Sequence, residues 1–66
     1  MFINILAEMA RRQMSKKEMA KKLDMHELTF DKKLQNKESY FTINQIVKIK
    51  EIFNDSNLTI EYLIAE

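Results

Sequence analysis

Hydrophobic residues recur along the chain at intervals of three and four positions, which is the spacing of one face of a helix. The first stripe consists of Phe2, Ile5, Leu6, Met9 and Ala10. A second, longer stripe consists of Ile43, Ile46, Ile49 and Phe53, widened by Val47 and Ile52. The sequence contains neither glycine nor proline, the residues that usually bound strands and hairpins. The pattern therefore predicts an all-α fold, and the 66 residues suffice for a single domain, 1–66.

Capping signals place the helices that open with polar residues. Ser15-Lys16-Lys17-Glu18 is a capping box, in which serine and glutamate each satisfy a free backbone N–H, so we expect a second helix over about 15–23. Thr42-Ile43-Asn44-Gln45 is another capping box and opens the helix of the longer stripe. Thr59 is expected to cap a last short helix, where Leu58 and Leu63 form a hydrophobic staple.

A further helix is expected between these, from about residue 27 to 35, with Phe30 and Leu34 as its buried anchors. His26 would lie at its N-cap, and Asn36 suits a left-handed residue just after its end. The sequence thus predicts five helices.

Two residues indicate how the helices over 15–23 and 27–35 pack. Ala20 is small where the following helix must cross closely, and Phe30 is a bulky anchor ten residues later. Such a pair fixes two helices at a steep angle, as in a helix-turn-helix. The outer face of the second of them then consists of Glu27, Leu28, Asp31, Lys32 and Gln35. A protruding helix of this kind fits a DNA major groove about 12 Å wide.

Charge is distributed unevenly, although the net charge is only +1. Residues 11–37 hold nine basic and four acidic side chains, whereas residues 38–66 hold two basic and five acidic ones. This asymmetry indicates one face for a polyanion. A solvated lysine-rich surface would explain the composition equally well.

The stretch "MSKKEMAKKLDMHELTFDKKLQNKESYFTINQIVKIKEIF" resembles the helix-turn-helix domain of the lambda-repressor-like (Cro and Xre-type) regulators common in phages and prophages. The resemblance covers nearly the whole chain. It rests on the cap at Ser15 and Glu18, on Met19-Ala20, Leu23 and Met25, on Thr29-Phe30 and Leu34, and on the apolar positions from Phe41 to Ile60. It implies a compact five-helix domain that binds double-stranded DNA as a small transcriptional regulator.

The resemblance also implies roles for individual residues. Base contacts fall on Glu27, Leu28 and Lys32, which can accept from cytosine, pack on a thymine methyl group and donate to guanine. Phosphate contacts fall on Lys16, Lys17, Lys33, Asn36 and Lys37. A homodimer contact of the last helices falls on Val47, Ile60 and Ile64, which would otherwise cover the core of the monomer.

The sequence departs from the family pattern at the corner and on the outer face. The glycine usual at the corner is replaced by Asp24, which can adopt the left-handed conformation at a cost of about 1 kcal/mol. Glu27 and Asp31 put carboxylates on the face that should meet DNA. An alternative is therefore a protein-interaction module on the same fold, an anti-repressor or an inhibitor of a host protein. A third possibility is an architectural protein that bends DNA with little sequence preference.

Other classes of function find no support in the residues present. There is no nucleophile beside a base, no glycine-rich phosphate loop and no paired-acid pocket, so we expect no enzyme, no cofactor and no small-molecule substrate. The single histidine, His26, has no partners at metal-ligand spacing, and the five methionines are expected to fill the core. The absence of cysteine, of a signal peptide and of a long apolar run predicts a cytoplasmic protein without a membrane span.

Overall fold

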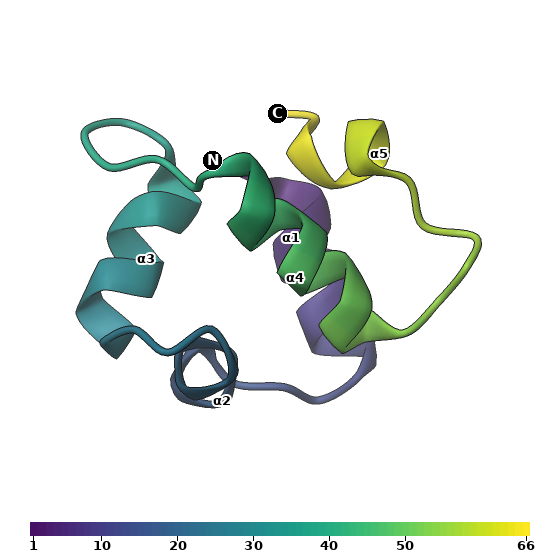
Figure 1. Cartoon of the computed structure of the whole chain (residues 1–66), viewed down its shortest axis with the longest axis horizontal. Coiled ribbons are helices and arrows are strands. Elements are labelled where there is room, and N and C mark those ends of the chain that lie inside the picture. Colours follow the sequence, from purple (N-terminus) through teal and green to yellow (C-terminus); the bar gives the residue numbers. More distant parts are fainter.

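The computed structural model describes all 66 residues and confirms an all-α fold of five helices (Figure 1). The helices are α1 (Ile3–Arg11), α2 (Lys16–Lys22), α3 (Glu27–Gln35), α4 (Ile43–Phe53) and α5 (Ile60–Ile64). The molecule measures 28 × 21 × 20 Å along its principal axes. None of the five helices has the length and apolar character that crossing a bilayer requires.

The helices form two groups in space. α2 packs against α3 on one side of the molecule, and α5 packs against both α1 and α4 on the other. Figure 1 shows α4 crossing in front of α1, with both chain ends at the same edge of the domain. The backbone N–H of Phe2 donates to the carbonyl oxygen of Leu34 at 3.0 Å, so the start of α1 is tied to the end of α3.

Twelve hydrophobic residues from all five helices and their flanks form one core. The predicted stripes supply most of it, but Ala10 and Val47 are exposed and Ile43 is 68% exposed. The prediction that Ala10 and Ile43 lie on the buried stripes is therefore wrong, whereas the exposure of Val47 agrees with its alternative placement on the surface of the monomer. At the start of α4, the ring of Phe41 packs against the core instead, 5.9 Å from the ring of Phe2 between centroids, which leaves Ile43 outside.

Four non-glycine residues adopt left-handed backbone conformations. They are Gln13, Asp24, Asn36 and Asn54, with φ values between 51° and 58°. Each lies just after a helix, where this conformation lets the chain turn away from the helix axis. The turns of a glycine-free chain are thus made mostly by asparagine and aspartate, the residues that best tolerate this conformation.

A buried carboxylate joins α1 to the C-terminal part of the chain. Glu8 is only 2% exposed; it accepts from Arg12 Nη1 at 2.7 Å, Arg11 Nη1 at 2.9 Å and the Tyr62 hydroxyl at 2.7 Å. The hydrogen bonds from Arg12 and Tyr62 lower the pKa of Glu8 against the opposing effect of burial, and the Glu8 carboxylate raises the pKa of Tyr62. Arg12 also lies over the Phe53 ring, 4.7 Å from its centroid. This cluster holds α1, α4 and α5 in register.

Candidate nucleic-acid interface

The α2–α3 pair is a helix-turn-helix whose inner surface is closed. Ala20 is 2% exposed, and Phe30 and Met19 are fully buried. The chain leaves α2 through the left-handed Asp24, and the backbone N–H of Met25 donates back to the carbonyl oxygen of Ala20 at 3.0 Å. A methyl side chain at position 20 thus lets the corner fold back closely over α2.

The start of α2 is fixed by the predicted capping box. The backbone N–H of Glu18 donates to Ser15 Oγ at 3.1 Å, and the backbone N–H of Ser15 donates to Glu18 Oε1 at 3.1 Å. His26 occupies the N-cap of α3 but makes no side-chain capping bond. Side-chain hydrogen bonds therefore cap the N-terminus of α2 but not the N-terminus of α3.

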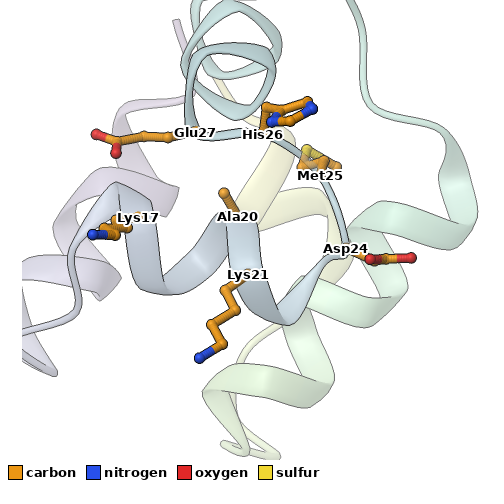
Figure 2. A pocket seen from close by; sticks show the side chains of 7 residues that line it. All are labelled: Lys17, Ala20, Lys21, Asp24, Met25, His26 and Glu27. Carbon is orange, nitrogen blue, oxygen red and sulfur yellow. The ribbon is translucent and has the colours of Figure 1, made fainter.

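A hollow separates the outer surfaces of the two helices (Figure 2). It is lined by Lys17, Ala20, Lys21, Asp24, Met25, His26 and Glu27. In Figure 2, Lys17 and Glu27 lie on the same side of the hollow and Ala20 points across it toward α3, whereas Lys21 and Asp24 point away. One basic and one acidic side chain, Lys17 of α2 and Glu27 of α3, thus line the same side of the hollow without forming an ion pair.

The exposed face of α3 carries the three predicted base-reading residues. Glu27 and Lys32 are exposed, and Leu28 is 65% exposed. Phe30 and Leu34, on the opposite face of the same helix, are fully buried. Because Leu28 and Lys32 lie one turn apart, they form a continuous ridge of apolar and cationic surface.

The predicted phosphate contacts divide into free and engaged side chains. Lys17 and Lys37 are exposed and make no ion pair, whereas Lys33 Nζ donates to the carbonyl oxygen of Tyr40 at 2.8 Å. Asn36 adopts the left-handed conformation expected of it, with φ of 58°, and its side-chain amide donates to Glu66 Oε1 at 2.8 Å. Lys33 therefore holds the loop after α3, and Asn36 holds the C-terminal segment.

Lys16, the remaining predicted phosphate contact, is paired within the interface. Its Nζ lies 2.6 Å from Oδ1 of Asp31 on the outer face of α3. Sequence analysis did not foresee this pairing, because the two residues are fifteen positions apart and only the crossing angle of the helices brings them together. The contact of Lys33 with the carbonyl oxygen of Tyr40 and the contact of Asn36 with Glu66 were not predicted either, because they depend on the paths of the loop after α3 and of the C-terminal segment.

The predicted dimer residues are not equivalent in the monomer. Val47 and Ile64 are each 41% exposed, whereas Ile60 is partly buried against the core. Of these three residues, Val47 and Ile64 thus offer the most apolar surface to a second molecule.

The five-helix fold with its crossed α2–α3 pair defines a small helix-turn-helix domain. The family model of the Cro/C1-type HTH DNA-binding domain matches residues 4–56, which is most of the chain. This protein therefore belongs to the Cro/C1-type helix-turn-helix family. Comparisons with curated proteins and with solved structures gave no significant match.

Proposed function

We propose that this domain binds a specific duplex DNA sequence and regulates transcription, as a small phage or prophage regulator. The observation that carries the proposal is the division of α3 into two faces, with Phe30 and Leu34 buried and Leu28 and Lys32 projecting into solvent. Leu28, which is 65% exposed, is accessible to an apolar group on a base edge. The phage or prophage setting is supported by the resemblance to small regulators of that origin.

Each projecting side chain of α3 has a matching group on a base edge. Lys32 donates to O6 and N7 of guanine, Leu28 packs on the methyl group of thymine, and Glu27 accepts from the amino group of cytosine. A good bidentate contact, such as that of Lys32 with guanine, discriminates against a wrong base by roughly 1–3 kcal/mol. Three adjacent contacts suit a short half-site.

Phosphate contacts flank this ridge. Lys17 at the start of α2 and Lys37 after the end of α3 have free ammonium groups. Lys33 and Asn36 each use one N–H within the protein and retain others, because an ammonium has three and an amide two. These residues position the domain and make its affinity dependent on salt.

A two-fold dimer would place two copies of α3 on successive major-groove turns. Val47 and Ile64 supply the apolar surface for this contact in the proposal. Two half-sites compensate for the modest area that one small module buries on DNA.

The test is selection from a pool of random 20-bp duplexes, followed by mobility shifts with the enriched duplex and a scrambled one. We expect wild type to enrich a sequence, Leu28→Ala and Lys32→Ala to lose preference at particular positions, and Lys48→Ala on α4 to retain it. Lys48→Ala is the matched control because it removes the same charge outside the helix-turn-helix. If no sequence is enriched at low salt and a protein partner is recovered instead, the protein-interaction alternative replaces this proposal.

A further inference from the structure

The pairing of Lys16 with Asp31 changes what Lys16 can do at a DNA surface. The 2.6 Å contact joins the first residue of α2 to the outer face of α3, and the two side chains are 39% and 34% exposed. Lys16, Asp31, Glu27 and Leu28 together line a hollow on this face. The ammonium group of Lys16 therefore lies beside the predicted base-reading residues.

Asp31 is the only acid of this hollow that Lys16 pairs with. Glu27 lines the same hollow but forms no ion pair. The charge of Lys16 is thus compensated inside the protein, while the acceptor capacity of Glu27 stays free. By contrast Lys17, the next residue along α2, has no carboxylate partner.

We infer that Asp31 is a positioning residue that turns Lys16 from a phosphate contact into a base-edge contact. The inference rests on the proposed function and adds a specificity device to it. One of the three N–H groups of Lys16 is occupied by Asp31, which fixes the direction of the other two beside Leu28. A lysine neutralised by a neighbouring carboxylate releases no counterion on binding, so it adds nothing to the salt dependence.

The decisive variant is Asp31→Asn, which removes the negative charge that pairs with Lys16 while keeping the size of the side chain. Released from its partner, Lys16 binds the nearest phosphate. The slope of log K against log salt concentration then becomes steeper by about 0.9, and the variant binds scrambled DNA more tightly. At the same time its preference for the duplex enriched by wild type over the scrambled duplex falls about tenfold.

The matched control is Asp24→Asn, the same substitution at the corner of the helix-turn-helix, where asparagine tolerates the left-handed backbone. We expect this control to leave the preference within about twofold and the slope nearly unchanged, because Asp24 forms no ion pair. Lys17→Ala should make the slope shallower by about 0.9, which calibrates the effect of one phosphate contact.

A double variant, Lys16→Met with Asp31→Asn, separates the two roles of Lys16. The double variant should keep the wild-type dependence of log K on log salt concentration, because the pair that it removes has no net charge. It should lose the preference for the enriched duplex over the scrambled one, because that pair reads a base. A slope that is shallower by about 0.9 in the double variant would mean that Lys16 already contacts phosphate in wild type, and would overturn the inference.

Two further results would also decide the matter. If Asp31→Asn and Asp24→Asn change the slope and the preference equally, only long-range charge is involved and the inference is wrong. If wild type enriches no sequence, the proposed function fails and the inference fails with it, whereas enrichment with an unaffected Asp31→Asn variant removes the inference alone. Circular dichroism of each variant confirms that the helices are retained.

Discussion

Removal of the Phe30 ring should unfold the domain, and this prediction tests the placement of α3 directly. Phe30 is fully buried, and its ring lies 5.7 Å from that of Phe41 between centroids, at an interplanar angle of 56°. Phe41 in turn lies 5.9 Å from Phe2, so three rings join α3, the loop after it and the start of α1. Loss of the Phe30 ring removes the contact between α3 and Phe41, the middle ring of the three.

The magnitude follows from burial and size. A buried phenylalanine replaced by alanine costs about 3–5 kcal/mol, and a favourable ring pair adds about 0.5–1.5 kcal/mol to the loss. A domain of this length has a free energy of unfolding of roughly 3–10 kcal/mol, at about 0.05–0.15 kcal/mol per residue. Phe30→Ala therefore removes most or all of the stability, while Phe30→Leu, which keeps an aliphatic group in place, should cost about 1–3 kcal/mol and stay folded.

Urea unfolding followed by circular dichroism measures both variants, with Leu28→Ala as the matched control. Leu28 lies two residues before Phe30 on the same helix but is 65% exposed, so its replacement should change the free energy of unfolding by less than about 0.5 kcal/mol. A folded Phe30→Ala protein with wild-type stability would refute the assignment of the buried face of α3. Equal losses for Leu28→Ala and Phe30→Leu would refute it as well.

Three other substitutions test separate parts of the fold. Glu8→Gln should destabilise the domain most above about pH 5. A carboxylate with a lowered pKa stabilises the folded state above its ordinary pKa of 4.5 and loses that effect as the pH falls. Urea unfolding from pH 3 to 7 should therefore show the free energies of unfolding of wild type and variant approaching each other in acid. Ser15→Ala should cost about 1 kcal/mol in the same assay through loss of the α2 cap, with no change at α4 in hydrogen exchange. Gln13→Gly should raise the thermal midpoint by a few degrees, since glutamine at φ of 54° is strained by about 1 kcal/mol and glycine is not; an unchanged or lower midpoint would contradict this.

Local signals in the sequence were sufficient to predict most helix positions. The capping boxes at Ser15 and Thr42 are formed as the spacing indicates, and both involve residues only three positions apart. Asn36 is left-handed for an equally local reason, since it follows the last turn of α3. Such features depend on few neighbours, so the sequence alone contains the information that defines them.

Contacts between distant segments were not predictable in this way. The i, i+3 and i, i+4 spacing of Glu8, Arg11 and Arg12 could have suggested ion pairs, but nothing local indicates that the Tyr62 hydroxyl, 54 positions away, completes the cluster. The exposure of Ile43 is another case, because the periodic pattern places it with Ile46, whereas the structure packs Phe41 against the core and leaves Ile43 in solvent. Periodicity thus identifies a helix face more reliably than it identifies where that face ends.

The charges around α3 explain how an acidic outer face can belong to a DNA-binding domain. Asp31 is compensated by Lys16, so on the outer face Glu27 and Lys32 remain as one free acid and one free base. A face with no net charge neither attracts nor repels the phosphate backbone strongly. The flanking lysines therefore supply most of the attraction to the phosphates. The proposed function then implies that few phosphate contacts set the salt dependence and that a larger share of the binding free energy depends on the bases that α3 meets. Under the proposed function, the acids that seemed to argue against DNA reduce non-specific attraction to the phosphate backbone, because they cancel the charge of neighbouring lysines.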